Sequence, residues 1–593
     1  MLLSCLLIFA APPPGDGSPP SPSTETPQEG LETAPKASTV LDFNETQPEG
    51  KDPESDPPED EEISFGDDGD DDFGTSENEE NPTISVNPTQ IKLTASTQFS
   101  LDLVHEPPTR GPAEQYAELY SAFRAEIIHK LNAAQTYRIK VKNRILVSRE
   151  HPSIEGAEIH GKILPELDQL RLDATLWPDL TALVGLQRVN WGFVDGQSPA
   201  SIFEPPDLRF GFGGDPADST LPVSAVVLRY QPEGWRQKLE FAWNPLFRPP
   251  ELLLFGSDWA MQSPNQPPGG PLGDLSWAVD PSVAHKWQTN LTYFQLPELK
   301  VQDHSLALRA SGRIKGIEWG TFGFYGFDLF PVLDLDEDLA WLLASMSLFG
   351  RAPLADLIAQ RPEIIPQLEA ITAKISDAQR EGSLGDLIKA TPHRLFQIGA
   401  QFRDVIGPFV FAVESTWTPG FNPCEAESVS DCRDHFGGGR SLFDLRMAPV
   451  RRPTLYSALQ LEWQRNEANQ IILMVTDFMV ADVPETPLAF LDSAFLDATG
   501  QLNRPFDKNN AHLLTVTGVW RSRHLDDRLE ILGSIVSHPM QGDYLAFGKA
   551  IWRLDDGRLQ FSLGADILGG EAGSMFGQFN HNDRLSFGIK ALQ

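Results

Sequence analysis

Basic residues recur at every second position in one short stretch of this chain. They are Arg138, Lys140, Lys142 and Arg144, and apolar residues stand between most of them; Arg171 lies in the next stretch of the same kind. In an extended strand, alternate residues share one face. A row of cations beside water attracts anions or the headgroups of amphiphiles. The five residues are therefore candidate lining residues of a water-filled pore.

Further charged residues stand on the polar side of similar stretches, and they complete the set of pore-lining candidates: Asp173, Arg558, Arg584 and Lys590. A structural interpretation of the basic row remains open. Glu118, Glu126 and Asp173 on neighbouring stretches could neutralise it, which would leave a ladder of ion pairs without a role in solute binding.

Motifs of nucleophilic, metal and nucleotide chemistry are missing from the sequence. It contains no Gly-x-Ser-x-Gly elbow, no His-Glu-x-x-His, no Cys-x-x-Cys and no phosphate-binding loop. The twelve His are scattered. We therefore expect no catalytic residues, no metal and no cofactor, and the protein is predicted not to be an enzyme. A barrel-embedded membrane hydrolase is kept as an alternative.

Two of the three cysteines, Cys424 and Cys432, close a short polar loop. A disulfide between them would suit an oxidising compartment. Two unpaired thiols are the other possibility.

The elements that must position these residues are stretches in which apolar and polar residues alternate. The clearest are 137–148, 558–567 and 584–592. Such strands have one apolar and one polar flank, and segments of about ten residues with this pattern are typical of transmembrane β-barrels. No run of apolar residues after the N-terminus is long enough for a helical membrane span.

Long and short connections alternate along these stretches. Short links join 224–230 to 236–243 and 394–402 to 409–416, and we expect residues 285–294 and 303–327 to be two further strands. Outer-membrane barrels have short periplasmic turns and long outer loops. The predicted fold is an all-β, transmembrane, antiparallel up-and-down barrel of about 16–18 strands in the outer membrane of a Gram-negative bacterium.

Composition divides the chain into segments. Residues 1–11 resemble the core of a signal peptide, residues 12–90 form an acidic, Pro-rich segment predicted to be disordered, and residues 91–593 form the barrel. The net charge is -36 and the pI is about 4.6. Because no long basic patch occurs, nucleic acid is not an expected partner.

The insertion at residues 331–391 is helical in character. Asp336 or Asp338 could cap a helix over 339–349, and Pro362 and Pro366 are expected to divide the helices that follow. The insertion could be a lid or plug of the lumen, or a cap that packs on itself and on the barrel mouth.

The loop after residues 180–190 holds three candidate constriction residues, Arg188, Trp191 and Asp207. This loop could fold into the lumen, or it could pack at the rim.

Part of this region resembles a known family. Gly185-Leu186-Gln187-Arg188-Val189-Asn190-Trp191-Gly192, then Pro205-Pro206-Asp207-Leu208, and the end from Gly577 to Leu585 are similar to motifs of proteobacterial outer-membrane β-barrels catalogued as a domain of unknown function. The chain departs from that pattern at Pro205-Pro206 and at Leu592-Gln593. The resemblance implies a porin-like or exporter-associated barrel without established catalytic residues.

The sequence and the resemblance together predict an outer-membrane channel or transporter that passes a small or amphiphilic solute. Its expected partners are outer-membrane lipid, the barrel-assembly machinery and an inner-membrane exporter. A secreted, soluble all-β binding protein is a further alternative.

Overall fold

The computed structural model describes residues 89–103, 115–150, 159–196, 198–207, 209, 219–251, 304–329, 332–336, 365–381, 388–391, 394–419, 440–443, 449–466, 468–481, 503–506, 509–554, 557–570, 574, 576–579 and 582–592. The signal-peptide core, the acidic segment up to residue 88, the expected helix at 339–349, and Cys424 and Cys432 lie outside these residues.

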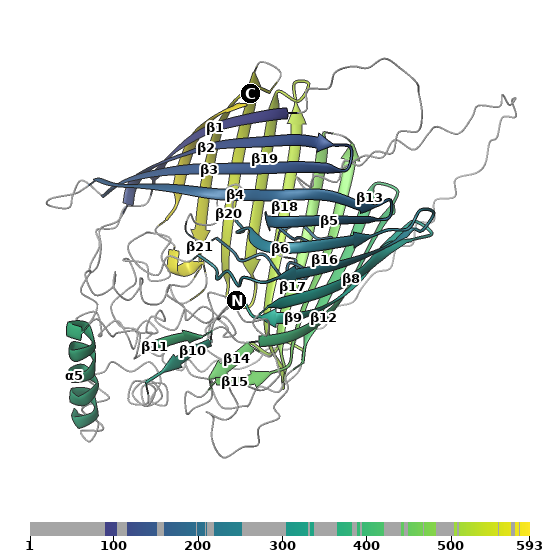
Figure 1. Cartoon of the computed structure of the whole chain (residues 1–593). Helices are drawn as coiled ribbons and strands as arrows, with labels where there is room; N and C mark the ends of the chain where they lie inside the picture. Colours follow the sequence, from purple (N-terminus) through teal and green to yellow (C-terminus); the bar gives the residue numbers. More distant parts are fainter. Residues whose placement is uncertain are drawn as a thin grey trace, which may run out of the picture. The chain divides into compact units, whose positions relative to one another are not determined.

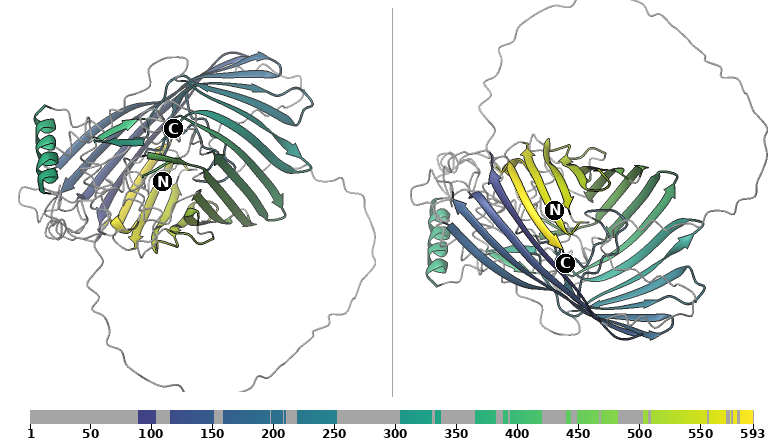
Figure 2. Two further views of the ribbon diagram at one scale, coloured as in Figure 1. Left: turned by 90° about the horizontal axis from the view of Figure 1, so that it is seen from below. Right: turned by 90° about the horizontal axis from the view of Figure 1, so that it is seen from above.

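Eighteen antiparallel strands form one sheet that closes on itself (Figure 1). Closure is made by the first and last strands, which lie side by side in purple and yellow in Figure 2. The strands are β1 (Thr89–Asp102), β2 (Gln115–Asn132), β3 (Gln135–Glu150), β4 (Ile159–Trp177), β5 (Leu180–Gln187), β6 (Val223–Tyr230), β7 (Gln237–Asn244), β8 (Ser305–Ile314), β9 (Ile317–Phe327), β12 (Arg394–Ile406), β13 (Phe409–Thr418), β16 (Thr454–Asn466), β17 (Asn469–Val480), β18 (Ala511–His524), β19 (Leu529–His538), β20 (Asp543–Leu554), β21 (Leu559–Gly569) and β22 (Arg584–Leu592). The predicted fold is confirmed.

One predicted strand is wrong. Residues 303–327 form the hairpin β8–β9, because Lys315 and Gly316 both have positive φ angles, of 52° and 94°. A two-residue turn of this kind matches the twist of the strands that flank it. Residues 285–294, expected as a strand, lie outside the described residues.

The outer face of the barrel is apolar. Val141 and Ile145 on β3 are exposed, whereas Lys142 and Arg144 between them are buried on the inner face. The same alternation places exposed Leu, Ile, Val and Phe side chains around the outside of the sheet. A surface of this kind is stable in lipid and costly in water.

Outward-facing aromatic residues border this apolar band at both ends. At the short turns they are Tyr137, Trp177, Tyr230, Trp235, Phe409, Trp463, Trp520 and Trp552. Near the long connections they are Trp243, Phe396, Trp417 and Tyr544.

The spacing of the two aromatic belts matches a bilayer. Phe409 and Trp417 lie eight residues apart on β13, as do Tyr544 and Trp552 on β20. Eight residues span about 27 Å along a strand, or about 21 Å across a membrane when the strand tilts by about 40°. The apolar band of outer-membrane barrels is about 25 Å tall. The soluble alternative gives no reason for two such belts.

Part of the insertion is described. β10 (Val332–Leu335) pairs with β11 (Ile388–Thr391), and α5 (Ile365–Glu381) lies between them in sequence. Pro366 lies in the first turn of α5, where its missing N–H costs no hydrogen bond. Pro362 lies outside the described residues, so the predicted division of the helices stays a prediction. Lys374 of α5 contacts Asp336 at 3.0 Å, so Asp336 forms an ion pair with the helix.

Three small elements complete the described chain. β14 (Arg440–Phe443) pairs with β15 (Pro449–Arg452), and a short 3-10 helix, η9, covers Gly577–Phe579. In the part of the chain described here, no helix combines the length and hydropathy needed to cross a bilayer.

We predict that a charge in the middle of the outer band destabilises the barrel. Leu459 on β16 faces outward midway between the aromatic belts and is 51% exposed. Leu459→Arg is expected to lower the free energy of unfolding in lipid vesicles by about 2–4 kcal/mol. The control is Leu525→Arg, in a turn beyond the belt and 58% exposed, which should change little. Equal tolerance of both variants in denaturant titrations would contradict a lipid-facing band.

Candidate functional site

The inner wall carries almost all of the predicted pore-lining residues. Those on the inward face of their strands are Arg138, Lys140, Lys142, Arg144, Arg171, Asp173, Arg584 and Lys590. Arg558 is the exception, because it lies exposed in the turn before β21.

The basic row on β3 is largely paired. Arg138 contacts Asp173 at 3.1 Å, and Arg171 contacts the same carboxylate at 2.6 Å. Asp173 is therefore one neutralising partner, as the structural interpretation expects. Glu126 stands directly opposite Lys140 on β2, but Glu118 pairs instead with Arg584, at 3.3 Å.

A β-bulge in β4 turns a further carboxylate inward. The pairing of β3 with β4 shifts by one residue between Lys140 and Val141, which leaves Asp168 as the extra residue. A bulge of this kind re-aims a side chain. Asp168 accepts a hydrogen bond from Arg188 at 2.7 Å, and so ties the start of the next loop to the wall.

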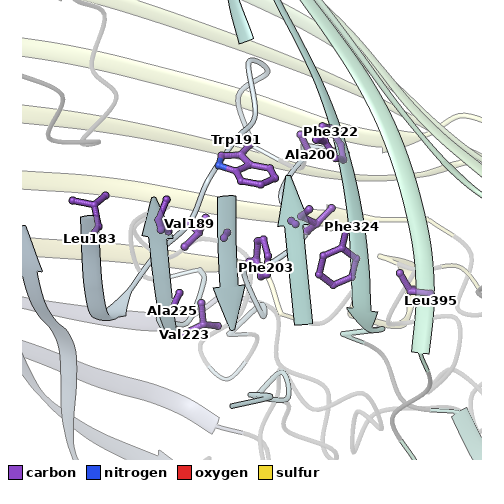
Figure 3. Close-up of a cluster of buried hydrophobic side chains, with 14 residues drawn as sticks. Leu183, Val189, Trp191, Ala200, Phe203, Val223, Ala225, Phe322, Phe324 and Leu395 are labelled. Atoms are coloured by element: carbon purple, nitrogen blue, oxygen red, sulfur yellow. The ribbon is translucent and has the colours of Figure 1, made fainter. Parts of the chain in front are cut away.

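Residues 188–207, which we call the inward loop, follow β5 into the lumen. Its apolar half, which consists of Val189, Trp191, Ala200, Ile202 and Phe203, packs against the inner wall of β6 to β12 (Figure 3). Trp191 meets Phe203 edge to face at 5.9 Å between ring centroids, and Phe203 meets Phe324 of β9 at 5.2 Å. The guanidinium of Arg309 on β8 lies 5.9 Å from the Trp191 ring. This contact buries large aromatic surfaces against short side chains of the inner wall, among them Ala225, Ala242 and Ala307 of the same cluster.

The tip of the inward loop is held by Glu414, which faces inward from β13. Its carboxylate accepts hydrogen bonds from the backbone N–H groups of Phe193 and Val194 and from the Ser198 hydroxyl. A side chain at Gly192 would place its Cβ 2.3 Å from the Ser198 hydroxyl oxygen, so only glycine fits there. Hydrogen bonds to a carboxylate are strong, and together they fix this tip on one strand.

A second contact of the tip is made one strand further round. The side chain of Gln460 on β16 accepts from the backbone N–H of Asp195 and donates to its carboxylate, both at 2.7 Å. Val194 packs with Met474 of β17, as part of a small buried cluster with Ala412 and Ala458.

The far end of the inward loop returns to β3. Asp207 accepts from Arg144 at 3.0 Å and from Arg209 at 2.7 Å, and both cations also contact Glu166 of β4. Burial alone would raise the pKa of the Asp207 carboxyl, but the hydrogen bonds from Arg209 and the charges of Arg209 and Arg144 hold it below its ordinary value. The contact therefore stays charged well into the acid range.

These attachments place the inward loop across the lumen. β3, which holds Asp207, and β16, which holds Asp195, are nine strands apart in either direction round the ring of 18. A segment joined to both walls must cross the space between them. All three predicted constriction residues belong to it.

Several residues of this site were missed in the sequence. Glu166 and Asp168 lie in a stretch whose alternation the bulge interrupts, and Gln460 resembles any polar residue of an inner face. Glu414 did offer a signal, because it is the only charged residue of β13.

Among the described residues, one Ser–His pair has the spacing of a nucleophile and its base, but its surroundings do not fit that role. The hydroxyl of Ser522 lies 2.8 Å from Nε2 of His524, but this serine is 1% exposed and donates its hydrogen bond to Oδ1 of Asn469. A nucleophile must give its hydroxyl proton to its base and be reached by substrate. In the described ranges, no three His, Cys, Asp or Glu side chains gather as a metal site requires.

No family model matches this chain, and no curated protein matches it either, so the resemblance to the family of unknown function stays a prediction. Solved structures with a similar fold are outer-membrane porins and channels. Salmonella typhi OmpF in complex with daunomycin is 7% identical, with 85% of this chain and 97% of that chain covered and a TM-score of 0.35. Pseudomonas aeruginosa OccK2 (OpdF) in complex with glucuronate is 7% identical, with the same coverage and a TM-score of 0.39. The outer-membrane channel DcaP of Acinetobacter baumannii is 8% identical, again with 85% and 97% covered, and its TM-score is 0.32.

We predict that Glu414→Gln loosens the inward loop without unfolding the barrel. The amide keeps the shape but replaces charge-assisted hydrogen bonds by neutral ones, at a cost of about 1–3 kcal/mol to the docked loop. Single-channel recordings should show a larger or noisier open current. The control is Glu462→Gln on the inner face of β16, whose carboxylate accepts from Gln470 and, within the described part of the chain, forms no hydrogen bond with the inward loop. Identical currents from both variants would show that Glu414 does not hold the loop in place.

Proposed function

We propose that this protein is an outer-membrane channel of a Gram-negative bacterium that passes a small or amphiphilic solute. The observation that carries the proposal is the inward loop, a segment attached to opposite walls of a closed barrel whose inner face is polar. A loop in this position narrows the lumen, and Arg188, Trp191 and Asp207 hold it there. Transport through such a pore needs no covalent chemistry.

The apolar band and its two aromatic belts support the membrane location, with the short turns on the periplasmic side. Outer-membrane lipid and the barrel-assembly machinery are the partners that such a barrel needs. The resemblance noted in the sequence adds membership of the exporter-associated barrel family and an inner-membrane exporter as a further partner.

The charge of the inner wall favours anions. The inward cations of β18 to β22 are Arg521, Arg523, Lys549, Arg553, Arg584 and Lys590, and the inward carboxylates there are Glu530, Asp543 and Asp566. The basic row of β3, on the other side of β1, adds little net charge, because Asp173, Glu166 and Asp207 pair with its arginines. The whole chain is strongly acidic, so this excess of cations belongs to the lumen and not to the general composition.

We expect the reconstituted protein to conduct in planar bilayers and to prefer chloride over potassium. In a KCl gradient, the reversal potential should shift toward the chloride equilibrium potential. The preference should weaken between about 0.1 M and about 1 M salt, because the Debye length falls from about 10 Å to about 3 Å. A cation-selective current would contradict the proposed role of the inner wall, and no current at all would contradict the channel.

The insertion between β9 and β12 is proposed as a lid of the lumen. Two of its described parts contact each other, because Lys374 of α5 forms an ion pair with Asp336, which follows β10. Connections as long as this one are uncommon and often have a function.

Removal of residues 337–387, with a short Gly-Ser link in their place, tests the lid. The barrel strands should still assemble, since none lies in the removed segment. We expect a higher open probability and faster solute uptake by liposomes. Unchanged gating and uptake, with the heat-modifiable gel migration of a folded barrel retained, would assign the insertion a packing role only.

A further inference from the structure

The inner wall opposite the apolar half of the inward loop holds an unusual group of side chains. Ile472 of β17, Val519 of β18, Leu532 of β19, and Phe547 and Ile551 of β20 all face inward. We call these five residues the apolar track. Inner faces of such barrels are ordinarily polar, because they meet water.

The members of the apolar track are neighbours across the sheet. Ile472 lies directly opposite Val519. Leu532 is opposite Lys549 and therefore diagonal to both Phe547 and Ile551, and it is diagonal to Val519 on its other side. Direct and diagonal cross-strand neighbours lie about 5–8 Å apart, close enough for one continuous apolar surface.

This surface is not covered by the loop that covers the other wall. All five side chains are half-buried, whereas the residues beneath Trp191 and Phe203 are buried almost completely. None of the five belongs to the buried clusters that the inward loop forms with the wall. The apolar track therefore offers apolar area to whatever enters the lumen.

A cation lies in the middle of the apolar track. Lys549 is on the same face of β20, between Phe547 and Ile551, and directly opposite Leu532. Among the described residues its ammonium forms no salt bridge, whereas the nearby Arg521 and Arg553 share Glu530. Asp566, opposite Phe547 on β21 and diagonal to Lys549, interacts electrostatically with both Arg584 and Lys549, so the ammonium shares this carboxylate with Arg584.

The next strand leaves room beside this cation. Gly564 lies opposite Lys549 and Ser562 lies opposite Ile551, so small side chains flank the ammonium where bulky ones flank it on its own strand. Apolar area on one side, an ammonium in the centre and small residues on the other side fit a molecule with an apolar body and an anionic head.

We propose that the apolar track and Lys549 form a binding site for an anionic amphiphile, a carboxylate or sulfonate with an alkyl or aryl body. The inference rests on the proposed channel and names the chemical class of its solute. The head pairs with Lys549, and the body lies along Leu532 and its apolar neighbours. Affinity then grows with tail length, by up to roughly fourfold for each fully buried methylene.

Octanesulfonate is the probe, applied below its micellar concentration to the full chain in planar bilayers. It should block the KCl current in a dose-dependent manner, with ethanesulfonate at least tenfold weaker because it lacks the tail. Octyltrimethylammonium, which has the tail and the opposite charge, should also be at least tenfold weaker. Equal block by octanesulfonate and ethanesulfonate would overturn the site.

Two variants locate the block. Lys549→Gln should weaken octanesulfonate about tenfold and leave the ethanesulfonate block nearly unchanged, and Leu532→Ser should weaken octanesulfonate by a similar factor. Arg403→Gln, which removes a cation from the inner face of β12 far from the apolar track, is the matched control. An equal loss in Arg403→Gln and Lys549→Gln would show a general charge effect and overturn the site. If Leu532→Ser fails to fold, the tail-length comparison in the natural chain decides.

Failure of the channel and failure of the site have different signatures. A barrel that conducts KCl but shows no tail-dependent block remains a channel and lacks the site. A barrel that does not conduct is examined by calorimetry in nanodiscs, with empty nanodiscs as the blank. Octanesulfonate binding that is lost in Lys549→Gln supports the site there, and no binding overturns it.

Discussion

Backbone hydrogen bonding is the constraint on which this structure depends. A sheet in lipid cannot leave an open edge, since each unpaired N–H or C=O group costs several kcal/mol away from water. The chain meets this demand by pairing its first strand with its last, from Thr94 with Leu592 to Asp102 with Arg584. Closure fixes the face of every strand residue. A slip of one residue would send the apolar flank into the lumen and the cations into lipid.

A closed ring of 18 strands encloses a lumen too wide to be filled by its own side chains. The inward loop occupies part of this space, and two different interactions decide where it lies. Aromatic burial holds Trp191 and Phe203, on either side of its tip, against β6 to β12, and hydrogen bonds to Glu414 and Gln460 hold the tip. At its end, Arg144 is almost fully buried with Glu166, Asp207 and Arg209. Buried charges are tolerated only as matched groups, so these four residues act as a unit.

How much the sequence could predict depends on how far apart in the chain the interacting residues lie. Alternation is local, and it was enough to predict the barrel and the inward direction of Arg138, Lys142 and Arg144. The hairpin at Lys315–Gly316 was missed because the alternation continues through a two-residue turn. Partners were harder to predict. Glu166 requires knowledge of the register across a bulge, and Glu414 is more than two hundred residues from the backbone that it binds.

The two sides of the lumen differ, and this difference determines how a solute can pass. The part of the wall from β5 to β12 that the inward loop covers is a buried apolar cluster. On β17 to β20 the side chains of the apolar track are half-buried, and they lie outside the buried clusters that the inward loop forms with the wall. An acidic chain has thus concentrated positive charge on one inner surface and placed apolar residues among it. Simple ions need only the charge of the wall. Apolar residues in the lumen would reduce its hydration and would not help such ions to pass. Their presence beside Lys549 is the reason why we propose a solute that has both an anionic and an apolar part.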